Sequence, residues 1–215
     1  MRDKLDDFDS VDISMTDMNL QVLPSMTGSV IFLIRHLTDE RSMSYQVKDG
    51  KLTIRENDNT GKFYYHVDIG FLSGLLGGGP VTTDENVVTL YIPEEQEWKM
   101  ADIKTDMSNI MLNGCKIENG TVQSNSGDIY FKNCDFDNLK IDSDMGDIHF
   151  VGTEDVIGAW NIQIDTDMGN IDVDDALGGK VKEDEDDCAL SYTQKGKGGK
   201  LVIQTDSGDV SLDCR

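Results

Sequence analysis

Carboxylate and carboxamide side chains recur at two fixed places of a repeated decapeptide, the pattern in this sequence best suited to chemistry. The repeat reads [IV]-x-[ST]-[DN]-[MS]-[GS]-[DN]-[IV]-x-[LFV] and occurs at 103–112, 122–131, 141–150, 164–173 and 203–212. With its first residue numbered zero, position three holds Asp106, Asn125, Asp144, Asp167 and Asp206. Position six holds Asn109, Asp128, Asp147, Asn170 and Asp209. If the copies stack, each column repeats its oxygen ligands about every 4.8 Å.

These columns have two interpretations. Calcium prefers several carboxylate and carbonyl oxygens, but the spacing fits neither an EF-hand loop nor the calcium-binding nonapeptide repeat. Asp and Asn are also ordinary in tight turns, because their side chains bond the local backbone. We favour structural turn residues and expect no cofactor. Calcium is the weaker alternative, with candidate ligands Asp106, Asp128, Asp144, Asp147, Asp167, Asp206 and Asp209.

The cysteines offer redox chemistry rather than a zinc site. None of Cys115, Cys134, Cys188 and Cys214 forms a C-x-x-C pair, and only three histidines are present. Cys115 and Cys134 occupy the same place in successive copies, so stacking would bring them within the Cα range of a disulfide, about 4.4–6.8 Å. They form either a disulfide or a pair of buried free thiols.

No catalytic constellation stands out. His36, His66 and His149 are scattered and lack motif neighbours, so we expect no enzyme. Trp98 and Trp160 are either core side chains or sugar-stacking platforms. The apolar segment 70–80 (GFLSGLLGGGP) lacks the P-loop lysine. It is either a packed loop or an exposed patch by which Phe71, Leu72, Leu75 and Leu76 contact a partner or a second copy.

The elements that position these residues are β-strands. A period near 20 residues is typical of a solenoid, and alternation places repeat positions zero and two inside, followed by a turn with Gly at position five. The interval before 164 contains four extra residues around 154–160. The interval before 203 predicts a degenerate coil, with 189–192 as its strand and 182–187 as an exposed loop.

Upstream of the repeats, alternating apolar residues predict strands joined by hairpins. Asp49-Gly50 between 43–47 and 51–55 is a strong hairpin turn signal. The predicted fold is all-β, one continuous domain over 1–215. Antiparallel strands and hairpins over 1–100 run into a single-stranded parallel β-helix over 101–215. We expect about five or six right-handed coils of about 19–20 residues, starting near 103, 122, 141, 164 and 203.

Charge narrows the class of partner. The formal net charge is −22, which disfavours nucleic acid and anionic membrane surfaces, since both need clustered Lys and Arg. No apolar run is long enough for a transmembrane segment, and the acidic N-terminus does not resemble a signal peptide. We expect either an extracytoplasmic protein whose leader or anchor lies outside this sequence, or a cytoplasmic one.

The repeat VQSNSGDIYF at 122–131 and its copies resemble the bacterial "putative adhesin" β-strand-repeat family, a domain of unknown function. Segments 8–24, 47–55 and 88–93 also resemble that family's opening strands, hairpin and lead-in strand. The resemblance implies an all-β, partly solenoidal fold and no established enzymatic activity. Many members are exported or anchored at the cell surface, and some are linked to envelope stress.

We therefore expect a non-enzymatic cell-surface or envelope module for binding or assembly. Its partner would be a protein or an envelope component, and a homo-oligomer is a further expectation. A carbohydrate-binding or carbohydrate-active β-helix is the first alternative. A cytoplasmic module that regulates the response to envelope stress is the second.

Overall fold

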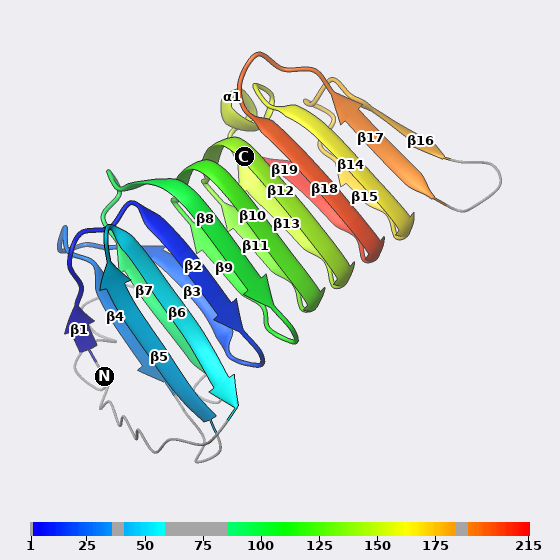
Figure 1. Cartoon of the computed structure of the whole chain (residues 1–215). Helices are drawn as coiled ribbons and strands as arrows, with labels where there is room; N and C mark the ends of the chain where they lie inside the picture. The colour runs from blue at the N-terminus through cyan, green and yellow to red at the C-terminus, as the bar shows by residue number, and fades with distance from the viewer. Residues whose placement is uncertain (1, 36–40, 59–85, 184–188) are drawn as a thin grey trace.

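The computed structural model describes residues 2–35, 41–58, 86–183 and 189–215 as two facing β-sheets with one short helix, α1 (Glu154–Ile157) (Figure 1). Sheet A has nine strands, in the order β1 (Arg2–Lys4), β4 (Ile31–Arg35), β7 (Val87–Ile92), β3 (Asn19–Pro24), β9 (Ile110–Asn113), β11 (Ile129–Lys132), β13 (Ile148–Gly152), β19 (Val210–Cys214) and β15 (Ile171–Val173). Sheet B has ten, in the order β16 (Lys180–Glu183), β17 (Leu190–Gln194), β14 (Asn161–Met168), β18 (Lys200–Ser207), β12 (Asp135–Met145), β10 (Lys116–Ser126), β8 (Glu97–Thr105), β2 (Ser10–Met15), β6 (Lys51–Asp58) and β5 (Arg41–Lys48). The all-β prediction is confirmed.

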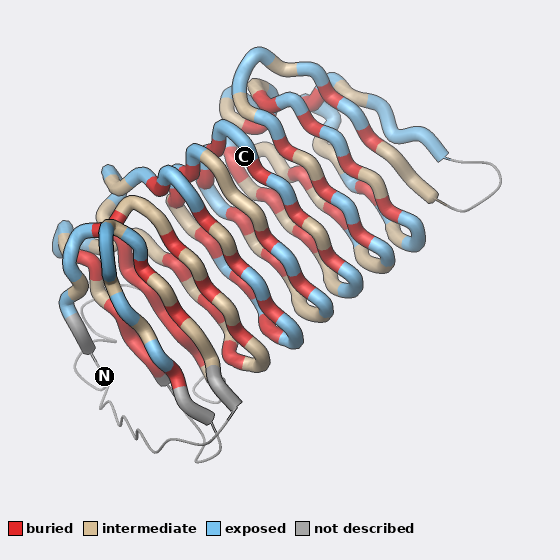
Figure 2. Tube along the Cα trace, in the orientation of Figure 1, coloured by how far each residue is buried: buried red, intermediate tan, exposed pale blue. Residues whose placement is uncertain are grey.

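Each repeat forms a rung, which we define as a strand of sheet B followed by a turn and a strand of sheet A. Rungs pair in parallel, so residues at equal repeat positions form columns running through the stack. Position zero gives one fully buried column of Ile103, Val122, Ile141, Ile203 and Ile164. Figure 2 shows the resulting alternation of buried and exposed residues along the strands. Each such side chain is worth roughly 1.5–3 kcal/mol of burial.

The order of the rungs departs from the order of the repeats. Rung β18/β19 lies between rungs β12/β13 and β14/β15, so Ile203 separates Ile141 from Ile164. The C-terminal residue accordingly lies beside the middle of the stack (Figure 1). The four extra residues before 164 form α1, which carries the chain past the inserted rung.

Among the described residues between 174 and 200, the predicted degenerate coil is not found. The strand expected at 189–192 is found as β17, but it pairs antiparallel with β14 and β16 and forms an edge hairpin. Lys182 and Glu183, expected in a loop, belong to β16; residues 184–188 lie outside the described part. Tyr192 of β17 continues the buried column next to Ile164, which explains why apolar alternation resembled another coil.

The N-terminal region is mixed rather than antiparallel. Three pairs are antiparallel, as predicted: β1 with β4, β4 with β7, and β5 with β6, which form the hairpin expected at Asp49-Gly50. However, β2 pairs in parallel with β6 and β8, and β3 pairs in parallel with β7 and β9. Segment 13–22 is therefore a further rung, whose Ile13, Leu20 and Val22 enter the buried columns.

Both tryptophans are core residues. Trp98 is fully buried and packs near Phe8, with ring centroids 6.5 Å apart. Trp160 is also buried and lies 4.3 Å from Phe136 between ring centroids. Neither indole is available to stack on a sugar.

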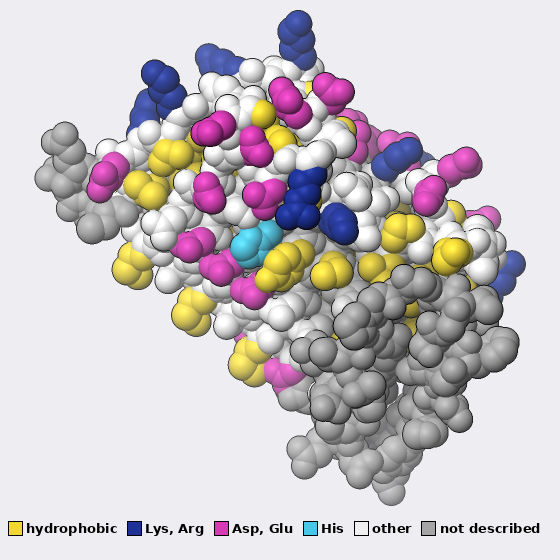
Figure 3. Space-filling view, turned by 180° about the vertical axis from the view of Figure 1, so that it is seen from behind, with side chains coloured by type: hydrophobic (Ala, Val, Ile, Leu, Met, Phe, Trp, Pro, Cys, Tyr) yellow, Lys and Arg dark blue, Asp and Glu magenta, His cyan; other side chains and the backbone are white. Residues whose placement is uncertain are grey.

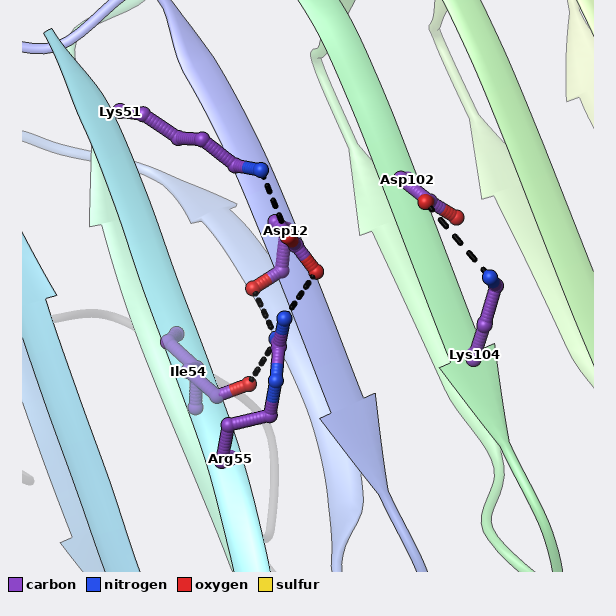
Figure 4. A network of polar contacts seen from close by, with 6 residues as sticks. All are labelled: Asp12, Lys51, Ile54, Arg55, Asp102 and Lys104. Carbon is purple, nitrogen blue, oxygen red and sulfur yellow. Dashed lines mark hydrogen bonds and ion pairs between the residues drawn. The ribbon is translucent and has the colours of Figure 1, made fainter.

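The β5–β6 hairpin is fixed to the first rung by polar contacts around Asp12 (Figure 4). The Asp12 carboxylate lies 2.6 Å from Lys51 Nζ and 2.6 Å from Arg55 Nη2. Partial burial raises the pKa of Asp12, but the bonds from Lys51 and Arg55 outweigh it and the pKa is lowered overall.

In the described part of the chain, no helix has the length and apolar character needed to cross a membrane.

Candidate functional site

The position-six side chains form a continuous hydrogen-bonded ladder at the turn between the sheets. Asn109 Oδ1 accepts the backbone N–H of Asp128 at 2.8 Å, and Asp128 Oδ1 accepts that of Asp147 at 3.1 Å. The ladder then continues through Asp209 to Asn170, following rung order rather than chain order. It begins at Asn19, whose Oδ1 bonds the N–H of Asn109 at 2.9 Å. We call this column the Asx ladder.

Glycine at position five allows the turns to approach this closely. A Cβ added to Gly146 would overlap the carbonyl oxygen of Gly127, and one added to Gly208 would overlap that of Gly146. Gly127 and Gly146 also have φ of +141° and +117°, in the region that disfavours a Cβ. The glycine column therefore sets the spacing at which each Asx side chain reaches the next backbone N–H.

The metal candidates fall into two groups. Asp128, Asp147 and Asp209 belong to the Asx ladder, where one oxygen of each carboxylate accepts a backbone N–H. The position-three carboxylates Asp106, Asp144, Asp167 and Asp206 are exposed at the turn, and Asp106 accepts a 2.7 Å bond from Asn125 Nδ2. Among the described residues, no group of three or more His, Cys, Asp or Glu is arranged to hold a metal ion.

The outer surface of sheet A carries the most distinctive polar cluster. Position eight forms a row in which Met111, Tyr130, His149, Ser211 and Asp172 register in that order. The Tyr130 and His149 rings stack with centroids 4.8 Å apart and an angle of 19°. His149 Nδ1 and Ser211 Oγ share a hydrogen bond of 2.8 Å. We call this row, with the adjoining Asx ladder, the sheet A face.

The electrostatics of the sheet A face are negative. Figure 3 shows the histidine in cyan with several carboxylates in magenta on one side of it and Lys or Arg side chains in dark blue close by on the other. Partial burial and then the charge of Asp128 raise the pKa of Tyr130, whose hydroxyl donates to Asp128 Oδ2 at 3.4 Å. Tyr130 therefore keeps its proton, and the face offers carboxylates, an imidazole and a phenol to a partner.

The same geometry argues against two chemistries. In a serine–histidine–carboxylate triad the carboxylate contacts the histidine, whereas Asp172 registers with Ser211 on the side away from His149. Sugar stacking needs an open aromatic face. Here the Tyr130 and His149 rings stack on each other, so one face of each ring is already covered.

A second surface feature is a row of methionines at repeat position four. Met107, Met145 and Met168 are 61%, 55% and 66% exposed. In rung order they alternate with Ser126 and Ser207. We call this edge the methionine ridge. The alternation exists only because rung β18/β19 is inserted, since in chain order Met145 and Met168 follow one another.

Cys115 and Cys134 lie on adjacent rungs as buried free thiols. A side-chain hydrogen bond with Cys134 and then burial hold the pKa of Cys115 well above its ordinary value. Cys134 Sγ also contacts the Leu112 carbonyl at 3.3 Å. The neighbouring placement matches the spacing argument, and a disulfide between them stays a prediction.

Several predicted residues lie outside the described part of the chain. These are Phe71, Leu72, Leu75 and Leu76, and also His36, His66 and Cys188.

The Tyr130–His149–Ser211 row was not predicted from the sequence. Its signal was available, because all three occupy position eight, but the neighbours of His149 depend on the inserted rung.

Comparison with known proteins gives a family and a fold. The family model described as Toastrack DUF4097 matches residues 8–215. A crystal structure of "a putative cell adhesion protein from Clostridium sporogenes ATCC 15579" superposes with a TM-score of 0.61 at 10% identity, covering 100% of this chain and 98% of that one. One of "a putative adhesin (BF0245) from Bacteroides fragilis NCTC 9343" has a TM-score of 0.36 at 11% identity, covering 98% and 94%. No curated protein sequence matches the chain.

Proposed function

This chain belongs to the Toastrack DUF4097 family, and we propose that it is a non-enzymatic binding or assembly module of the bacterial cell surface. Its contact surface in this proposal is the sheet A face. The scaffold is a right-handed β-solenoid that holds this face rigid. The description of the similar Clostridium structure as a "putative cell adhesion protein" is consistent with such a role.

The observation that carries the proposal is the Tyr130–His149–Ser211 row beside the carboxylates of the Asx ladder. Strands fix these side chains in register, so little conformational entropy is lost when a partner binds. The negative charge of the face favours a partner with hydrogen-bond donors or positive charge. A protein or another envelope component of that kind fits better than an anionic polymer.

The test uses the purified full chain and isolated bacterial cell envelopes in a sedimentation assay. We expect the wild-type chain to sediment with the envelopes. The double variant Tyr130→Ala/His149→Ala should be retained at least about 10-fold less, the effect of losing about 1.4 kcal/mol. The matched control is Gln123→Ala/Gln204→Ala on the outer surface of sheet B, which should sediment like wild type.

Equal sedimentation of the Tyr130/His149 variant and wild type would overturn the choice of surface. Failure of the wild-type chain to sediment with any envelope preparation would overturn the surface-binding role. It would favour the alternative of a cytoplasmic envelope-stress module. Binding to a glycan array that survives the Tyr130/His149 changes would instead favour the carbohydrate-binding alternative at another surface.

A further inference from the structure

Rung β18/β19, the last in the chain, lies inside the stack between two rungs that come earlier in the chain. Strand β18 pairs in parallel with β12 on one side and with β14 on the other, and β19 does the same with β13 and β15. Its inward residues Leu201, Ile203, Val210 and Leu212 are all buried. The rung therefore joins two parts of the stack that are formed earlier in the chain.

Without this rung, a gap one rung wide would separate those two parts. Within the described residues, β14 pairs only with β17 and β18, and β15 pairs only with β19. The segment containing α1 spans the gap covalently. Without the rung, the backbone hydrogen-bonding groups along the facing edges of β12 and β14 would be unpaired, and a single strand between them could pair with both edges. The gap is an acceptor for a rung of matching register.

The connection into the rung is a short glycine-rich hinge, residues 195–199 (KGKGG). It is anchored upstream because Gln194 Nε2 donates to the carbonyls of Ile157 and Trp160 at 3.0 and 3.2 Å. The closed hinge lies so near the chain before β14 that a Cβ on Gly196 would overlap the Ala159 carbonyl. The closed form consequently depends on glycine at 196.

We propose that rung β18/β19 is an exchangeable element, and that the rung of a second copy of this chain can fill the gap. Exchange replaces every contact in the gap with an identical contact from the other copy, so only the hinge and the association entropy distinguish the two states. This is the condition under which domain swapping gives dimers at low cost. The inference is independent of the proposed surface-binding function.

Gly196→Ala tests the hinge. The substitution is incompatible with the closed turn but not with an open one, and strained hinges favour swapping. We expect a folded dimer, seen by light scattering as twice the 23.9 kDa mass of one chain. The matched control is Gly178→Ala, because a Cβ there meets nothing within 4 Å. It should leave the chain monomeric.

A disulfide trap identifies which segment is exchanged. Asp142 of β12 is the registered partner of Gln204 on the inserted rung, whereas Gln123 and Asp142 are partners on the two rungs before it. Chains carrying Asp142→Cys and chains carrying Gln204→Cys are unfolded, mixed and refolded in the Gly196→Ala background, with Cys188 and Cys214 changed to serine. We expect a mixed disulfide for this pair and none for Gln123→Cys mixed with Asp142→Cys.

Two results would overturn the proposal. One is a Gly196→Ala chain that stays at single-chain mass at every concentration, whether folded or unfolded. The other is a mixed disulfide between Asp142→Cys and Gln204→Cys chains that is no more abundant than in the control mixture. Loss of envelope sedimentation with intact swapping would count only against the proposed function, so the two ideas fail separately.

Discussion

At the scale of single residues, the recurrent Asp and Asn side chains act as backbone substitutes at the turns. Along the Asx ladder as far as Asp209, the Oδ1 of each side chain accepts the backbone N–H of the next rung, so the oxygen matters and the charge does not. That explains why Asn and Asp interchange at position six. Their place at turns could be predicted from the sequence, but the bonds between rungs could not. Asp and Asn are equally common in turns where they bond only their own local backbone, so the residue types alone do not distinguish the two arrangements.

This role of the Asx ladder predicts a difference between two substitutions of Asp128. Asp128→Ala removes the acceptor for the Asp147 N–H and should lower the free energy of unfolding by about 0.5–1.5 kcal/mol. Asp128→Asn keeps an acceptor oxygen and should stay near wild type. Urea denaturation measures both.

The control for the Asp128 experiment is Asp144→Ala at exposed position three, which should have little effect. Millimolar calcium should not shift the unfolding midpoint of the wild-type chain, because one oxygen of each ladder carboxylate is already used. A loss in Asp128→Asn as large as in Asp128→Ala would show that charge, and with it cation binding, matters after all.

At the scale of elements, the sequence predicts strands and their inward faces well but their order poorly. Ile103, Val122, Ile141, Ile164 and Ile203 are buried in register as expected. Neighbouring rungs, however, present nearly equivalent edges and columns, so nothing local shows which rung lies beside which. The insertion of β18/β19 is therefore invisible to periodicity.

The first rung was missed for a different reason. At segment 13–22, Met15 and Met18 occupy places that elsewhere hold Ser/Thr and Gly. At this turn the structure places a side chain from strand β6 of the hairpin against the backbone. Glu56 Oε2 accepts the backbone N–H groups of Thr16, Asp17 and Met18 at 2.7, 3.0 and 3.1 Å. The carboxylate thus caps the last turn of the column within the described residues.

Removing this cap should loosen the attachment of the β5–β6 hairpin. Glu56→Ala leaves the three turn N–H groups without that acceptor, and hydrogen bonds to charged groups contribute about 1.5–3 kcal/mol. We expect faster amide hydrogen exchange at residues 16–18 and a lower melting temperature, with Glu56→Gln intermediate. Glu97→Ala, at an exposed position of β8, is the control. Unchanged exchange at residues 16–18 in Glu56→Ala would contradict the capping role.

At the scale of the whole molecule, stacking converts chain positions into continuous surfaces with different chemistry. The sheet A face is acidic with one imidazole, and the methionine ridge is apolar and thioether-rich. Neither could be assembled from the sequence, because both depend on the inserted rung. The methionines of the ridge and of the core differ in exposure. Met107, Met145 and Met168 are more than half exposed, whereas Met15 and Met18 are 3% and 0% exposed.

This difference predicts how the molecule responds to peroxide. A peroxide oxygen transfers to an accessible thioether, giving a sulfoxide and water, and accessibility controls the rate. Met107, Met145 and Met168 should oxidise well before Met15 and Met18, as followed by peptide mass spectrometry. The melting temperature should stay constant until the core methionines react, because the ridge side chains extend into solvent. The Met107→Leu/Met145→Leu/Met168→Leu variant should lose the early oxidation of the three ridge peptides, while the other exposed methionines, Met26, Met100 and Met111, still react early. A melting temperature that falls in step with ridge oxidation would show that these side chains support the stack.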